Sequence, residues 1–247
     1  MTKSILAFVF SITFSSLLHG AVIDTNNPSV VSTFQSGATI VNFESVSGST
    51  PQTITAYTSG DPVSPTSFVF NQIPGVQFSV GGAPGTNEPA LYQLSGSIAS
   101  DAHSATTVLG PVDFDFTTKF NSGAMMELFF PTKVSKVGFW LNPSLGNVEL
   151  IAADTNFAFS HLPETNLEIA PSVTAGNFVG IERPTADIGG FKIIGLDATG
   201  FTIDDFTVGG ASAPAVPEPA VAALIAIGLI GLLLLRKRGH NRGSSLK

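Results

Sequence analysis

Between residues 22 and 210 the chain alternates short apolar runs with clusters of Gly, Pro, Ser and Thr, and charged residues are sparse. Runs rich in Val, Ile, Thr and Phe that are punctuated roughly every 8 to 12 residues are typical of a sandwich or barrel of short strands. No stretch shows a convincing 3.6-residue period, so no helix is expected there. Strands are predicted at 39–44, 67–70, 76–80, 112–117, 124–130, 134–141, 148–152, 156–160, 178–182, 190–196 and 201–208.

Some of these segments have a more specific pattern. The sequence 113–116, Asp-Phe-Asp-Phe, alternates strictly, which predicts both phenylalanines in the core and both aspartates in water. The runs 148–152 and 157–159 flank a short polar turn and predict a hairpin. The Gly- and Pro-rich stretches 45–67 and 81–89 are expected to be long surface loops, which often hold ligand sites.

The first 21 residues have the order of a secretory signal peptide. Lys3 precedes an apolar run, and the small residues Gly20 and Ala21 follow it. Cleavage is expected after Gly20 or Ala21. The protein is therefore predicted to be exported.

An apolar segment lies near the other end. Residues 220–235 are uncharged, and Arg236, Lys237 and Arg238 follow directly. At about 1.5 Å per residue this helix reaches roughly 24 Å, which spans a ~30 Å hydrocarbon core with local thinning or a snorkelling Arg236. The basic residues are expected on the cytoplasmic side. The alternative, a helix of a globular core, would need a polar stripe, and this segment has none.

The two ends divide the chain into five predicted parts: a signal peptide (1–21), a β-sandwich domain (22–210), a linker (211–219), a transmembrane helix (220–235) and a basic cytoplasmic tail (236–247). Both ends predict the same topology, in which the domain faces away from the cytoplasm.

Charge and cysteine content exclude several functions. Residues 22–215 hold 17 acidic and five basic residues, a net charge of −12. An acidic domain without basic patches argues against binding to nucleic acid or to anionic lipids, and it suits cation binding or simple solubility. The chain has no cysteine, so neither a disulfide framework nor thiolate chemistry is available.

The motif Val216-Pro217-Glu218-Pro219, followed by the apolar segment and Arg236-Lys237-Arg238, resembles the PEP-CTERM sorting signal. The resemblance covers about the last thirty residues, and it implies that an exosortase reads Pro217, Glu218 and Pro219 and removes the anchor. The protein would be held transiently in the inner membrane facing the periplasm, and then reach the cell surface or extracellular matrix. The two prolines keep the strip extended for a protease. An ordinary single-pass anchor behind a proline-rich linker is the alternative.

A second resemblance concerns the domain. The run Val41-Asn42-Phe43-Glu44 and the run 201–208, Phe-Thr-Ile-Asp-Asp-Phe-Thr-Val, look like the first and last strands of jelly-roll carbohydrate-binding modules. This implies a jelly-roll-like antiparallel β-sandwich in which the two strands are neighbours and share a structural calcium. Glu44 and one or both of Asp204 and Asp205 would supply carboxylates. The alternative is that the two aspartates face water on an edge strand.

The last strand also has an irregularity that the residues themselves show. Phe201 and Ile203 share one parity, whereas Phe206 and Val208 share the other. The inward face therefore switches at the two aspartates between them, which predicts a β-bulge.

Trp140 is the first candidate for sugar binding. Alternation in the run 137–141 places Phe139 and Leu141 inward and Trp140 outward, where an indole can stack on a sugar ring. A tryptophan covered by a loop is the alternative. Tyr57 and Tyr92 lie near the long loops and are second candidates.

Evidence for catalysis is thin. Asp113 and Asp115 share a predicted strand face, but such pairs are usually only solvated. His103 and His161 have no metal-ligand spacing, and no nucleophile elbow or phosphate loop occurs. The first hypothesis is a non-enzymatic surface β-sandwich that associates with extracellular polysaccharide. The others are a glycan hydrolase on the same jelly roll and a purely structural matrix or adhesion protein.

Overall fold

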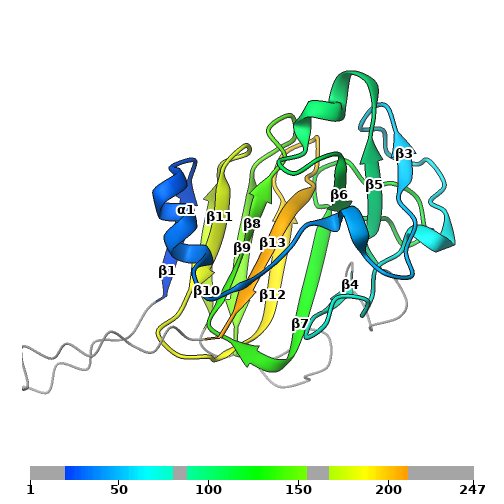
Figure 1. Cartoon of the computed structure of the whole chain (residues 1–247). Helices are drawn as coiled ribbons and strands as arrows, with labels where there is room; N and C mark the ends of the chain where they lie inside the picture. The colour runs from blue at the N-terminus through cyan, green and yellow to red at the C-terminus, as the bar shows by residue number, and fades with distance from the viewer. Residues whose placement is uncertain (1–19, 80–87, 155–166, 211–247) are drawn as a thin grey trace, which may run out of the picture. The chain divides into compact units, whose positions relative to one another are not determined.

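The computed structural model describes residues 20–79, 88–154 and 167–210, which form two facing β-sheets (Figure 1). This confirms the prediction of an all-β sandwich. The hairpin partner predicted at 157–159, the signal peptide, the linker, the apolar segment 220–235 and the basic tail lie outside the described residues. Within the described part of the chain, no helix has the length and apolarity to cross a membrane.

The larger sheet, called sheet A, has the strand order β1-β11-β8-β13-β6-β5-β3, and β2 also pairs with β13. Its pairs are antiparallel except for β3 and β5, which run parallel, so the expectation of a wholly antiparallel sandwich is corrected at this edge. Its strands are β1 (Ala21–Thr25), β2 (Thr39–Val41), β3 (Gln52–Ile54), β5 (Ala90–Leu94), β6 (Thr107–Gly110), β8 (Lys136–Leu141), β11 (Phe178–Glu182) and β13 (Ile203–Gly209).

The second sheet, sheet C, is antiparallel and has the order β10-β9-β12-β7-β4. Its strands are β4 (Gln77–Ser79), β7 (Met125–Val134), β9 (Val148–Ala153), β10 (Glu168–Val173) and β12 (Ile188–Gly195). The main core fills the space between the two sheets, and strand alternation supplies it. Phe139 of β8, Phe191 of β12 and Phe206 of β13 are fully buried there.

The outer face of sheet A is covered in two separate places. At one end, Tyr92, Leu94 and Val108 of β5 and β6 pack under the long connections of that region. At the other end, Phe178 of β11 packs under a helix. The strand residues of each cluster alternate along their strands with the residues that face the main core.

That helix is α1 (Pro28–Gln35), and it corrects the expectation that the domain has none. Asn27 caps it by accepting a hydrogen bond from the Ser29 N–H at 3.0 Å, and Pro28 occupies the first turn. Val31 and Phe34, three residues apart, are its buried side chains. The helix is a little over two turns long, too short for a period to stand out in the sequence, but its cap signal is present.

Phe34 packs on a part of sheet A where the two facing strand residues are glycines. Gly138 of β8 and Gly180 of β11 pair directly, and the ring of Phe34 lies over them. A Cβ at Gly138 would come within 2.8 Å of Phe34, and one at Gly180 within 2.6 Å of the Val137 carbonyl. The two glycines therefore allow the helix to approach the sheet.

The strict alternation at 113–116 does not form a strand, and that prediction is wrong. Val112 and Thr118 form an isolated bridge, and the residues between them make a turn in which the Phe116 N–H donates to the Asp113 carbonyl. Phe114 is 65% exposed, and Phe116 has a φ of 60°. A period of two over four residues does not distinguish a strand from a tight turn.

Other boundaries also differ. The predicted strand 39–44 ends at Val41 and is followed by the 3-10 turn η1 (Phe43–Ser45). The strand predicted at 67–70 is wrong: Ser67 ends the 3-10 turn η2 (Pro65–Ser67), and Phe68 forms only an isolated bridge with Ala90. The 3-10 helix η3 (Gly96–Asp101) was not predicted. Strands β1, β3, β5, β6 and β10 were missed because each is short or, in β10, contains a proline.

Candidate functional site

The site begins at an irregularity in β13. Asp204 pairs with Trp140 of β8 and Thr207 pairs with Gly138, so β13 has one extra residue between these two pairs. Asp205 lies in the extra position with a φ of 46°. Ile203 and Phe206 are both buried in the core on either side. The β-bulge that the parity switch predicted is therefore confirmed.

The bulge also marks a change of neighbour. On one side of β13, β6 pairs at Ile203, and β2 pairs at Phe206, Thr207 and Val208. The neighbours implied by the jelly-roll resemblance, the strand containing Val41 and the last strand, are thus confirmed as a pair. The chain that leads into β6 crosses the gap between β2 and β6, and we call residues 102–106 the crossing loop.

Three carboxylates hold the crossing loop. Glu44 accepts hydrogen bonds from the N–H groups of Thr106 and Thr107 at 2.8 and 2.5 Å. Asp204 accepts from the N–H and the hydroxyl of Ser104 at 2.6 and 2.9 Å. Carboxylates that accept several N–H donors fix a loop strongly, because each bond is charge-assisted.

Asp204 is 3% exposed, and burial raises the pKa of its carboxyl. The hydrogen bonds from Ser104 and from the Asp205 N–H oppose this by stabilising the charged form, and the nearby charge of Asp205 adds to the increase in pKa. Burial has the largest effect, so the site keeps a carboxylate in an unfavourable environment for the sake of the loop it holds.

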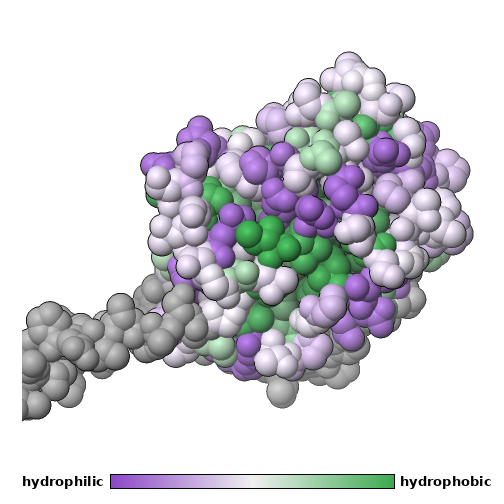
Figure 2. All heavy atoms as spheres, viewed as in Figure 1, coloured by the Kyte–Doolittle hydropathy of each residue, from purple (hydrophilic) through white to green (hydrophobic). Residues whose placement is uncertain are grey.

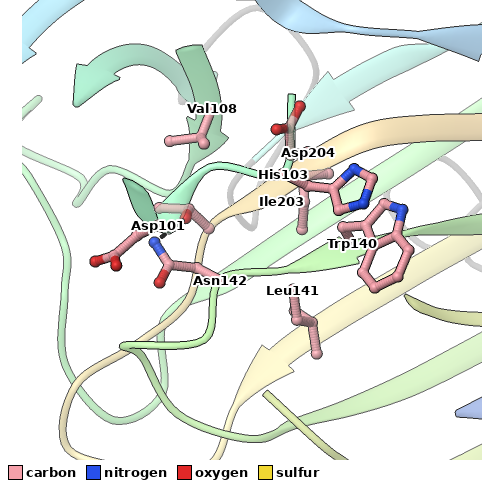
Figure 3. A pocket seen from close by; sticks show the side chains of 9 residues that line it. Asp101, His103, Val108, Trp140, Leu141, Asn142, Ile203 and Asp204 are labelled. Carbon is pink, nitrogen blue, oxygen red and sulfur yellow. Dashed lines mark hydrogen bonds between the residues drawn. The ribbon is translucent and has the colours of Figure 1, made fainter. Parts of the chain in front are cut away.

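Asp205, the third carboxylate, positions the imidazole ring of His103. Its Oδ2 lies 2.6 Å from Nδ1 of His103, at the start of the crossing loop. The imidazole lies flat on the indole of Trp140, with ring centroids 4.0 Å apart and an angle of 7° between the planes (Figure 3). Phe178 meets the same indole edge-on at 5.7 Å.

Trp140 lies on the outer face of sheet A, while Phe139 and Leu141 lie in the core, as the alternation predicted. It is half-buried rather than freely exposed. The alternative that a loop covers this tryptophan is therefore correct in part, because His103 of the crossing loop covers one face of the indole.

A hollow of about 360 Å³ lies beside the stacked rings, and we call it the α1 hollow. One helical face of α1 lines it, with residues spaced three and four apart: Pro28, Val31, Ser32 and Gln35. Ile40, His103, Trp140 and Asp205 complete the lining. Figure 2 shows hydrophobic residues near the middle of the face that carries α1 and β13, with hydrophilic residues around them. The volume of the α1 hollow is in the usual range of ligand sites.

A second, much smaller cavity of about 10 Å³ also lies next to the rings (Figure 3). Asp101, Asn142 and Thr202 line it, as do Trp140 and His103. It has room for about one water molecule among polar groups, so it supports the site rather than offering a ligand space.

The two tyrosines do not line the α1 hollow. Tyr92 is fully buried and donates to the Pro111 carbonyl, so its candidacy for sugar stacking is wrong. Tyr57 is half-buried, donates to Asp101 and accepts from Asn142. Burial raises the pKa of both phenols well above the usual value.

The implied calcium ligands all hold the crossing loop, and their oxygens face hydrogen-bond donors. Glu44 and Asp204 accept from four backbone N–H groups and two hydroxyls, and Asp205 pairs with His103. Among the described residues no group of three or more acidic or histidine side chains has the arrangement of a metal site. This donor set fits a pinned loop, and calcium at these residues stays a prediction.

The acidic pair considered for catalysis lies elsewhere, on the turn at 113–116. Asp115 accepts from Thr117, and Asp113 lies 3.6 Å from Lys119. His161 lies outside the described residues. The sequence did not indicate His103, Ser32 or Gln35 as site residues. For Ser32 and Gln35 the helix cap at Asn27 was an available signal; for His103 none was, since its partners are remote in sequence.

Comparisons with known proteins give little. No protein-family model matches the chain, and no curated protein matches it. Among solved structures it is similar to TmCBM61, described in complex with β-1,4-galactotriose, with 17% sequence identity and a TM-score of 0.31. The match covers 57% of this chain and 97% of that one. A TM-score this low does not establish a common fold.

Proposed function

We propose that the chain is an exported, non-enzymatic protein of the cell surface or extracellular matrix, whose sandwich binds polysaccharide in the α1 hollow. In this proposal the PEP-CTERM signal at Val216-Pro217-Glu218-Pro219 directs it to an exosortase. Before processing, the segment 220–235 and the stop residues Arg236, Lys237 and Arg238 hold it in the inner membrane, with the domain in the periplasm. The jelly-roll connectivity belongs to the same proposal.

One observation carries the binding proposal: the α1 hollow combines aromatic and apolar surface with a few polar groups. The stacked rings of Trp140 and His103 line it together with the amide of Gln35 and the hydroxyl of Ser32. Sugars have the complementary surface, with apolar C–H faces and hydroxyl edges. Ligand sites usually have this mixture of a mostly apolar lining and a few placed polar groups.

The geometry favours binding over hydrolysis. Glycoside hydrolysis needs two carboxyl groups about 5 to 10 Å apart across the bond that is cut. Among the described residues that line the α1 hollow, Asp205 is the single carboxylate, and it pairs with His103. In a purely structural protein Trp140 would serve only its packing on His103 and Phe178, and the α1 hollow would bind no glycan.

A glycan array with the full-length protein, purified in detergent, tests this proposal. We expect binding to a subset of glycans, and a loss of about two- to tenfold in Trp140→Ala, since an aromatic stacking contact contributes roughly 0.5 to 1.5 kcal/mol. The matched control is Phe114→Ala, which removes a 65% exposed aromatic side chain from the turn at 113–116. Equal glycan-binding signals from the unmodified protein and from Trp140→Ala would exclude the α1 hollow as the binding site.

The sorting proposal has its own test. In cells that contain an exosortase, Glu218→Ala should leave the protein at full length in the membrane fraction, whereas Glu164→Ala should be processed normally. Size on a denaturing gel of membrane and medium fractions measures this. Normal processing of Glu218→Ala would show that the motif is not what is read.

Calcium at Glu44, Asp204 and Asp205, the third part of the proposal, has a separate test. A fall in melting temperature on chelation, reversed by added calcium, would support it. An unchanged melting temperature would leave the carboxylates with the loop-holding role that their hydrogen bonds describe.

A further inference from the structure

The charged groups around the α1 hollow indicate which polysaccharides fit it. Among the described residues, its lining contains one carboxylate, Asp205, and neither lysine nor arginine. Recognition of uronic acids or sulfated sugars normally uses such cations, because they supply charge-assisted hydrogen bonds. The α1 hollow lacks them.

Nearby cations do not compensate. Lys136 lies under α1, but its side chain is 2% exposed, and its Nζ donates to the carbonyls of Phe34 and Ser36 at 2.8 and 2.9 Å. His103 adds no unpaired cation either, because its Nδ1 faces the carboxylate of Asp205 at 2.6 Å.

The polar groups that remain suit hydroxyls. Asp205 uses Oδ2 for His103, and among the described residues no group donates to its Oδ1. A carboxylate oxygen accepts a hydrogen bond from a sugar hydroxyl. The amide of Gln35 donates one N–H to the Thr207 hydroxyl at 3.1 Å, and its second N–H and its oxygen can pair with sugar hydroxyls. A sugar carboxylate near Asp205 would instead meet a like charge.

We propose that the α1 hollow selects neutral polysaccharides and disfavours uronate polymers, with Asp205 as the residue that makes the difference. This inference rests on the proposed function, because it names the ligand class of the same site. Two effects act together: the domain charge of −12 repels polyanions at long range, and Asp205 repels them at contact. Salt screens the first effect far more than the second.

The test uses the full-length protein in detergent and the emission of Trp140, the only tryptophan of the chain. Neutral probes are a soluble β-glucan, a galactan and a mannan, and anionic probes are alginate and polygalacturonate. We expect at least one neutral polymer to bind about tenfold or more tightly than either anionic one, at low and high salt. The fluorescence emission of Trp140 must change when a polysaccharide binds, since Trp140 lines the α1 hollow.

Asp205→Asn isolates the contact effect. Asn also tolerates the left-handed backbone of this position, so the bulge should be kept. We expect affinity for alginate or polygalacturonate to increase roughly fivefold at high salt, as a like charge is removed. Asp113→Asn, on the distant turn at 113–116, is the control for net charge and should change nothing at high salt.

The outcomes separate the two proposals. Tighter binding of a uronate polymer than of every neutral one would overturn the selectivity and leave polysaccharide binding in place. No binding to any probe and no hit on the glycan array would overturn both. An unchanged ratio of neutral to anionic affinity in Asp205→Asn, with an unchanged melting temperature, would remove Asp205 from the explanation.

Discussion

His103 lies flat against Trp140, although the two residues belong to a loop and to a strand of different parts of the chain: their ring centroids are 4.0 Å apart and their planes differ by 7°. Asp205 holds the imidazole in this place at 2.6 Å. The crossing loop therefore determines how much of the only tryptophan meets water, and this can be measured without knowing a ligand.

Replacing His103 by Ala should uncover one face of Trp140. We expect its fluorescence emission to shift to longer wavelength and its quenching by acrylamide to increase about twofold, because the indole gains contact with solvent. The far-ultraviolet circular dichroism should stay unchanged, since His103 is 47% exposed and lies outside the strands. Phe114→Ala should leave the emission as it is; an identical shift in both variants would contradict the stacked arrangement.

Gly180→Ala should destabilise the domain by about 1 to 3 kcal/mol. The added methyl would lie 2.6 Å from the Val137 carbonyl and 3.0 Å from the ring of Phe34, and the backbone contact cannot be relieved by a side-chain rotation. Urea unfolding measures the free energy of unfolding. Gly210→Ala is the matched control, because no atom lies within 4 Å of its added Cβ, and a similar loss there would count against the close packing around Gly180.

Lys136→Met should cost about 1 to 3 kcal/mol of the free energy of unfolding, although it replaces a buried charge by an apolar side chain of similar length. The reason is that Nζ donates to the carbonyls of Phe34 and Ser36, which end α1 and would lose this partner. Lys133→Met, at an exposed lysine of β7, is the control and should be close to neutral. Urea titrations of both variants give the comparison, and equal stabilities would show that α1 does not depend on this cap.

The two tyrosines give a pH dependence of stability. Burial raises the pKa of Tyr57 and of Tyr92 in the folded chain, so the unfolded chain loses these protons first as the pH rises past about 10. The free energy of unfolding should therefore be constant with respect to these groups below that pH and fall above it.

Since the chain has no other tyrosine, phenolate absorbance reports on these two directly. We expect both to titrate above the usual value in native protein and at the usual value in urea. Tyr92→Phe should remove part of the fall in stability. A native titration centred near 10 would show that the phenols are not buried as described.

The bulge at Asp204-Asp205 shows what local pattern predicts well. A change of parity within one strand is a property of neighbouring residues, so the sequence predicted it, as it predicted that Trp140 faces away from the core. The strands β7, β8, β9, β11, β12 and β13 were predicted for the same reason, since each has a long enough apolar pattern. The turn at 113–116 was predicted wrongly because four residues hold too little pattern to separate a strand from a turn.

The sequence by itself determined the class of the domain, the face of each long strand and the place of the bulge, because these follow from side-chain alternation within a few residues. It also predicts a route of export, which the described residues do not address. Only the tertiary structure brought His103 to Trp140, set α1 opposite them and gave the carboxylates of Glu44, Asp204 and Asp205 a loop to hold. These contacts join segments as many as 102 residues apart, and their free energy depends on burial and geometry that appear only when the sheets are packed.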